Sequence, residues 1–78
     1  MMNMVTKEIY LKADDIPCTG CVEDMEKVLR DQEGILEATV NYAEEIIHIK
    51  YDPEVIERAD VIHTARKIAN ISKIISEQ

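Results

Sequence analysis

The stretch LEATVNYAEEIIHIKY, residues 36–51, decides the fold of this 78-residue chain. Apolar and polar residues alternate over 36–40 and again over 47–51, which predicts two strands that each bury one face. The connection Asn41–Glu44 is short, so the two strands should form an antiparallel hairpin. The residues expected on the buried face are Leu36, Ala38, Val40, Ile47, Ile49 and Tyr51.

A helix is predicted immediately before the hairpin, over Cys21–Gln32. Its apolar residues recur at spacings of three and four, and they are Val22, Met25, Val28 and Leu29. Acidic residues occupy its early turns and Arg30 its last turn, as the helix dipole favours. Gly34 is expected to end it. Before this helix, alternation predicts a first strand over Val5–Lys12, followed by a loop over residues 13–20.

A second helix and a short strand are predicted after the hairpin. Asp52-Pro53 ends the hairpin, and the helix should run from about Glu57 to Ala69. Its apolar stripe is expected to contain Ala59, Ile62, Ala65, Ile68 and Ala69. We expect Asn70 to stop the helix in the left-handed conformation, and Ile71–Ile75 to form the closing strand.

The order strand, helix, strand, strand, helix, strand predicts an α+β fold, the ferredoxin-like βαββαβ sandwich. It has a four-stranded antiparallel sheet with both helices on one face. Seventy-eight residues leave room for a single domain, residues 1–78. The loop over residues 13–20 should then open at one end of this sandwich.

Charge and size exclude several classes of function. The chain has 16 Asp and Glu against 9 Lys and Arg, a net charge of −7, which argues against binding nucleic acid. No apolar run approaches the roughly 20 residues that span a bilayer, so we expect no direct membrane insertion and a cytoplasmic location. The small size also argues against an enzyme with a deep cleft.

The chemistry of the chain is concentrated in Cys18-Thr19-Gly20-Cys21, which contains both cysteines. Cys21 falls in the first turn of the predicted helix, where the dipole lowers a thiol pKa and favours the metal-binding thiolate. Two thiolates suit Cu(I), whereas structural zinc normally takes four ligands. We therefore expect Cys18 and Cys21 to bind one soft metal ion. Asp15 is the nearest oxygen donor that could supply a further ligand.

Two other interpretations of the cysteine pair remain open at this point. The cysteines could be buried thiols without a ligand, or they could serve a glutaredoxin-like thiol-disulfide oxidoreductase. The redox alternative requires a cis-proline opposite the dithiol, and neither Pro17 nor Pro53 is placed for that. Elsewhere, His48 is expected on the polar face of its strand and His63 away from the apolar stripe, so neither is expected to be a ligand.

The segments Asp15–Cys21, Glu33–Ile35 and Tyr51–Pro53 together resemble motifs of the heavy-metal-associated domain family, which is found in copper chaperones and metal-transporting P-type ATPases. Asp15–Cys21 stands where that family has Gly-Met-Thr-Cys-x-x-Cys, Glu33–Ile35 matches its Pro-Gly-Val turn, and Tyr51–Pro53 matches its Tyr-Asp-Pro. The resemblance implies a monomeric, non-catalytic module that delivers metal by exchange of thiolate ligands. Its partner would be a metal-transporting P-type ATPase or another CxxC metal-transfer protein, and the chain itself a free chaperone or one module of a transporter.

Departures from the family motifs bear on which metal is bound. Ile16 replaces a methionine that anchors the loop in the core, and isoleucine can fill that role. Pro17 stiffens the approach to Cys18, and Asn70-Ile71 replaces a glycine followed by an aromatic residue near the metal. Cu(I) is the preferred ion, with Zn(II), Cd(II) and Hg(II) as alternatives.

Overall fold

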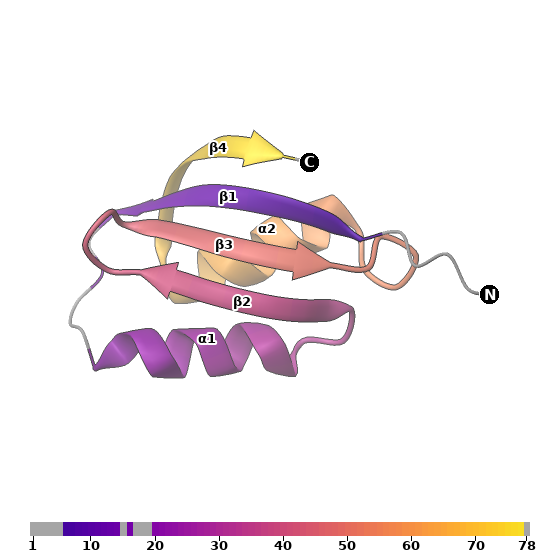
Figure 1. Ribbon diagram of the computed structural model, residues 1–78, viewed down its shortest axis with the longest axis horizontal. Helices are drawn as coiled ribbons and strands as arrows, with labels where there is room; N and C mark the ends of the chain where they lie inside the picture. Colours follow the sequence, from indigo (N-terminus) through magenta and orange to yellow (C-terminus); the bar gives the residue numbers. More distant parts are fainter. Residues whose placement is uncertain (1–5, 15, 17–19, 78) are drawn as a thin grey trace.

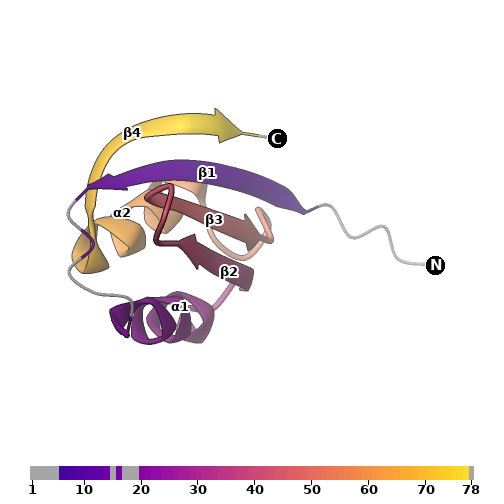
Figure 2. The same cartoon turned by 60° about the vertical axis from the view of Figure 1, so that its left-hand side comes forward.

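The computed structural model describes residues 6–14, 16 and 20–77, and it has the predicted order of elements. The elements are β1 (Lys7–Asp14), α1 (Cys21–Asp31), β2 (Ile35–Asn41), β3 (Ile46–Tyr51), α2 (Arg58–Ile68) and β4 (Asn70–Glu77). The four strands form one antiparallel sheet in the order β2-β3-β1-β4. Both helices lie on the same side of this sheet (Figures 1 and 2). The predicted ferredoxin-like sandwich is confirmed.

The core lies between the sheet and the two helices and is almost entirely aliphatic. Its largest fully buried side chains are Ile9, Leu11, Leu29, Ile47, Ile49 and Val61. They come from the two central strands, β1 and β3, and from both helices. These four elements therefore share a single core. At about 1.5–3 kcal/mol for each large aliphatic side chain, burial here is the main source of stability.

β1 is shifted toward the C-terminus relative to the prediction, because it begins at Lys7 and continues through Ala13 and Asp14. Ala13 is fully buried and pairs with Ile71, while Asp14 pairs with Asn70. The sequence Ala-Asp-Asp is typical of a loop. The alternation that buries Ile9 and Leu11 nevertheless continues to Ala13, two residues further along the strand. Pairing with β4 overrides the weak local preference. The loop between β1 and α1 is correspondingly shorter.

β2 departs from the predicted alternation at its start. Leu36 is 42% exposed, and Ile35 takes the buried position instead. The register with β3 shifts between Ile35 and Glu37, as a β-bulge does. An extra residue in one strand turns the preceding side chains to the opposite face. The other predicted buried positions of the hairpin are confirmed.

The apolar stripe of α2 is also shifted from the prediction. Val61 and Thr64 are buried and Ala59 is exposed, whereas Ile62 and Ala65 are buried as expected. The larger Val61 gains more from burial than Ala59, so the helix rotates to bury it. In α1, Val28 is likewise 48% exposed, in contrast to the prediction.

The helix ends differ from each other. Asn70 does not stop α2 in the left-handed conformation, because Ala69 is extended and Asn70 already begins β4. Gly34, in contrast, has the predicted positive φ, of 97°. Its carbonyl accepts a hydrogen bond of 2.8 Å from the backbone N–H of Asp52, which joins the end of α1 to the end of β3.

Candidate metal site

The predicted metal loop connects the end of β1 to the start of α1. Cys21 is the first residue of α1 and is partly exposed, so the residue lies where the loop enters the helix. Ile16, in the middle of the loop, is buried in the core with 8% of its surface exposed, as expected for the loop anchor. Cys18 and Asp15 lie outside the described residues, so their positions stay predictions.

The start of α1 is suited to a thiolate. Gly20 occupies the N-cap position with helical backbone angles, and no described side chain caps the helix there. The first-turn N–H groups and the positive end of the dipole therefore favour negative charge at Cys21. Glu23 and Asp24 follow in the same turn, and both are exposed. They add negative charge to the surface around the sulfur.

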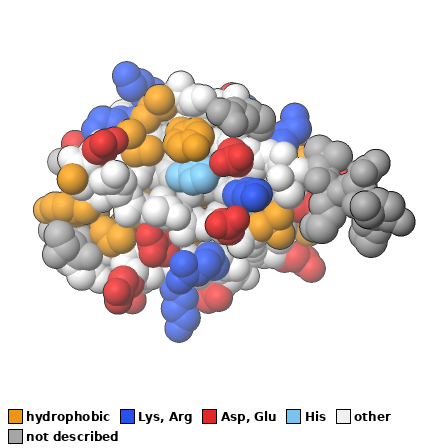
Figure 3. Space-filling model, in the orientation of Figure 1, with side chains coloured by type: hydrophobic (Ala, Val, Ile, Leu, Met, Phe, Trp, Pro, Cys, Tyr) orange, Lys and Arg blue, Asp and Glu red, His pale blue; other side chains and the backbone are white. Residues whose placement is uncertain are grey.

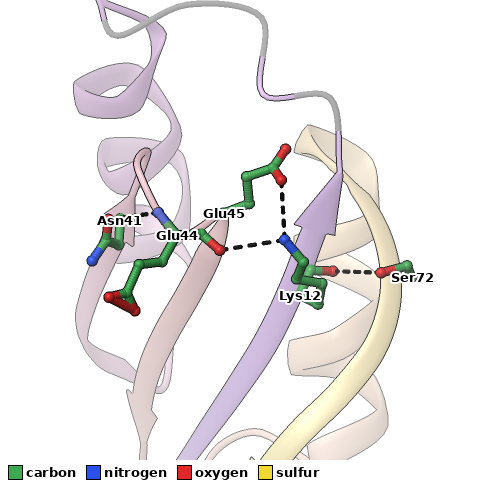
Figure 4. A network of polar contacts seen from close by, with 5 residues as sticks. All are labelled: Lys12, Asn41, Glu44, Glu45 and Ser72. Carbon is green, nitrogen blue, oxygen red and sulfur yellow. Dashed lines mark hydrogen bonds and ion pairs between the residues drawn. The ribbon is translucent and has the colours of Figure 1, made fainter.

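The strand end from which the loop departs is held by the β2–β3 turn. The Ala13 N–H donates a hydrogen bond of 2.8 Å to the carbonyl of Glu45, a residue with a positive φ of 58°. The Lys12 ammonium lies 3.0 Å from Oε1 of Glu45 and donates to the Glu44 carbonyl at 3.3 Å (Figure 4). On the other side, Ser72 of β4 donates to the Lys12 carbonyl at 3.5 Å. The loop thus starts from a strand fixed on both sides.

A shallow groove of about 250 Å³ borders Cys21. Its lining residues are Cys21, Asp24, Met25, Val28 and Ile68. Met25 is 6% exposed, which confirms it as a core residue. The exposed Val28 widens this surface, so the sulfur of the first helical residue sits beside a mainly apolar patch.

Both histidines lie on the surfaces that the sequence indicated. His63 is exposed on α2. His48 is on the outer face of the sheet, with Nε2 2.7 Å from Oε1 of Glu8 and its ring stacked on Tyr10 at 4.4 Å. Figure 3 shows this face as a mixture of acidic, basic and apolar side chains around a histidine. Within residues 6–14, 16 and 20–77, no three His, Cys, Asp or Glu residues converge on one point.

Two features of the structure were not predicted. Glu26 on α1 accepts a hydrogen bond of 2.8 Å from the Val40 N–H, and thereby fixes the helix against the edge strand β2. At the end of the sheet opposite the metal loop, Arg58 and Glu77 form a two-point ion pair. The hydrogen bond from Arg58 lowers the pKa of Glu77, and burial raises the pKa of nearby Tyr51. The apolar periodicity of the sequence does not predict either interaction, because each joins polar groups of residues that are distant in sequence.

The fold and the cysteine placement define a small metal-binding domain, and comparisons with known proteins agree. The chain belongs to the heavy-metal-associated domain family, whose sequence profile matches residues 11–76. Its function is that of a metal-binding and delivery module, and family membership does not favour the glutaredoxin-like alternative.

Similar sequences occur in much longer proteins. The chain is 45% identical to the copper-transporting ATPase 1 of Mus musculus over 47 residues, which are 60% of the chain and 3% of that protein. It is 28% identical to the copper-exporting P-type ATPase of Bacillus subtilis over 76 residues, 97% of the chain and 10% of that protein. The chain therefore spans only a small part of these relatives.

Similar solved structures confirm the fold. One is the N-terminal domain of a potential copper-translocating P-type ATPase from Bacillus subtilis in its Cu(I)-loaded state. It has a TM-score of 0.81 and 27% identity, with coverage of 95% of this chain and 92% of that domain.

In the part of the chain that is described, no helix is both long and apolar enough to cross a membrane.

Proposed function

We propose that this chain binds one Cu(I) ion between the thiolates of Cys18 and Cys21 and delivers it to the thiols of a partner protein. The observation that carries the proposal is the position of Cys21 as the first residue of α1, partly exposed, at the end of a heavy-metal-associated fold. An ion held there is accessible to an incoming ligand.

Copper is preferred over other metals for two reasons. Two thiolates satisfy Cu(I), whereas Zn(II) and Cd(II) call for added oxygen or nitrogen ligands. The relatives from Mus musculus and Bacillus subtilis are copper-transporting and copper-exporting ATPases. One similar domain was solved with Cu(I) bound. Asp15 would be the third ligand only if zinc or cadmium were the native ion. Hg(II), which also accepts two thiolates, remains a competitor in the same site.

Transfer would proceed by ligand exchange. A thiolate of the partner attacks the ion, a three-coordinate intermediate forms, and Cys18 or Cys21 leaves as a thiolate. A second exchange of the same kind releases the remaining cysteine, so that two partner thiolates hold the ion. The proposed partner is a metal-transporting P-type ATPase or another CxxC protein in the cytoplasm, where thiols stay reduced. The chain would act as a monomer and without catalysis of its own. Exposed acids beside the loop, Glu23, Asp24 and Glu44, favour a docking surface rich in Lys and Arg.

The test is a competition titration of reduced protein with Cu(I) and a chelator of known affinity. We expect one ion per chain, and a loss of at least about a thousandfold in affinity, near 4 kcal/mol, in Cys18→Ser or Cys21→Ser. The controls His48→Ala and His63→Ala each remove an imidazole side chain and should keep the Cu(I) affinity of the parent protein. Tight Cu(I) binding by the double serine variant would show that the site assignment is wrong.

A further inference from the structure

Positive charge is gathered in one part of this acidic chain. Residues 58–77 contain four Lys and Arg against two acids, whereas residues 1–57 contain five against fourteen. The cationic part consists of α2 and β4. These two elements therefore present a surface of opposite sign to the rest of the molecule, including the metal loop.

A groove of about 380 Å³ lies between α2 and β4. Its lining residues are Arg58, Ala59, Ile62, His63, Arg66 and Ile74, with no acid among them. Five of these belong to α2 and follow the spacing of one helix face, so the groove runs along α2. Arg58 is paired with Glu77, whereas Arg66 is exposed and forms no ion pair with a described residue. Ile62 and Ile74 contribute apolar side chains to its lining.

The groove lies beside an open sheet edge. β4 pairs with β1 on one side only and is the last strand of the described sheet. Figure 2 shows it at the rim, beginning next to the end of α2 and arching along β1. Ile75 is 44% exposed on this strand. Natural proteins protect such an edge with charges, proline, β-bulges or a covering element, because its backbone groups can pair with another chain. β4 contains the exposed Lys73 and two register shifts in its pairing with β1, and it pairs with no second strand among the described residues.

We propose that the edge of β4 and the groove beside it bind an acidic, extended segment of a partner protein. The segment adds to the sheet as a further strand, through main-chain hydrogen bonds to β4. Its side chains on the helix side then alternate between carboxylates that pair with Arg66 and apolar groups that contact Ile62 and Ile74. Backbone pairing supplies affinity in this mode of recognition, and the side-chain contacts supply specificity.

Charge decides between a partner segment and a second copy of this chain. A symmetric dimer through the edges of β4 would bring two cationic grooves together, and like charges at close range are unfavourable. A segment rich in Asp and Glu gains charge-assisted hydrogen bonds from the guanidinium of Arg66 instead. The groove shares no lining residue with the one that contains Cys21, so a bound segment would leave the metal site accessible.

The experiment titrates the full chain, reduced and metal-free, with the peptide Glu-Thr-Val-Thr-Glu-Thr-Val-Thr-Glu and follows backbone amide NMR shifts. We expect shifts confined to β4 and the groove side of α2, with new protection of amides on the outer edge of β4. Arg66→Glu should weaken binding by about tenfold or more, because a charge-assisted hydrogen bond is lost and a repulsion is added. Lys67→Glu changes the net charge equally on the next residue, which does not line the groove, and should retain affinity within about twofold.

Three results would overturn the proposal. The first is equal binding of a peptide with Lys in place of Glu. The second is shifts centred on α1 and Cys21 rather than on β4. The third is self-association through β4, seen as slowed diffusion without peptide, which would make a second copy the occupant. Because every NMR measurement uses metal-free protein, none of these results bears on Cu(I) binding by Cys18 and Cys21.

Discussion

The two ends of α1 are built in opposite ways. A Cβ atom added to Gly20, before the first turn, would meet no atom of the described residues within 4 Å. A Cβ atom added to Gly34, after the last turn, would lie 2.6 Å from Cγ2 of Ile56 and 3.1 Å from Cγ1 of Val55. Gly34 also needs its positive φ of 97°, whereas Gly20 has ordinary helical angles. One end is a closed junction and the other is open.

This difference separates the parts that hold the fold from the part that we propose binds metal. At the closed end, Gly34 and Asp52 join α1 to β3, and the Asp52 carbonyl accepts hydrogen bonds from the N–H groups of Val55 and Ile56. At the open end, the loop is attached through the end of β1 and the buried Ile16. Ligand exchange needs accessible sulfurs, so a tightly packed loop would oppose the function.

Gly34→Ala is expected to give the largest effect on stability. The substitution adds backbone strain at positive φ and a steric clash with Ile56, each worth about 1–3 kcal/mol, so we expect the free energy of unfolding to fall by about 3 kcal/mol. Urea denaturation of the metal-free protein measures it. Gly20→Ala is the matched control and should change stability by less than about 0.5 kcal/mol. Equal effects of the two substitutions would remove the distinction between the ends of α1.

Much of this architecture could be predicted from the sequence, because apolar periodicity follows directly from burial. Ile9, Met25 and Ile49 lie where alternation or helical spacing places them. The misses have local causes that periodicity does not contain. The bulge that exposes Leu36 depends on pairing with β3, and the strand at Ala13 depends on β4, which is distant in sequence.

The site was predictable to a different degree. CxxC placed before a helix is visible in the sequence, and Cys21 does begin α1. Ile16 could be assigned to the core because it stands where the resembling family has a methionine that anchors the loop, and it is buried. The ion pair of Lys12 with Glu45, which fixes the start of the loop, could not be predicted. It joins polar residues from two elements, and only the register of β1 and β3 brings them together.

Salt should slow metal transfer at the open end by several-fold. The acids near Cys21 attract a basic partner, and this steering is screened when salt rises from about 0.05 to 0.5 M. Stopped-flow transfer rates to the cognate partner measure the effect. Asp24→Asn should lower the rate at low salt, whereas Glu54→Gln, an exposed acid at the closed end, is the control. A rate that rises with salt would eliminate electrostatic steering from the mechanism.

Removal of metal should leave the fold nearly unchanged. The aliphatic core is continuous between the sheet and both helices and does not include Cys21. Far-UV circular dichroism of the metal-free protein should therefore match that of the loaded form, with a cooperative thermal transition. A random-coil spectrum that recovers when Cu(I) is added would instead mean that metal binding and folding are coupled, as in zinc fingers.

Asp15→Ala is expected to give the smallest effect, and it tests which metal the open end binds. Two thiolates complete the coordination of Cu(I), so loss of this carboxylate should change Cu(I) affinity by less than about twofold. Zn(II) has use for an oxygen ligand, and its weaker binding should depend more on Asp15. Competition titrations with both ions on the parent and the variant give the comparison, with Asp14→Ala as the control on the neighbouring residue. If the parent binds Zn(II) tightly and Asp15→Ala weakens it by tenfold, about 1.4 kcal/mol, zinc replaces copper as the native ion.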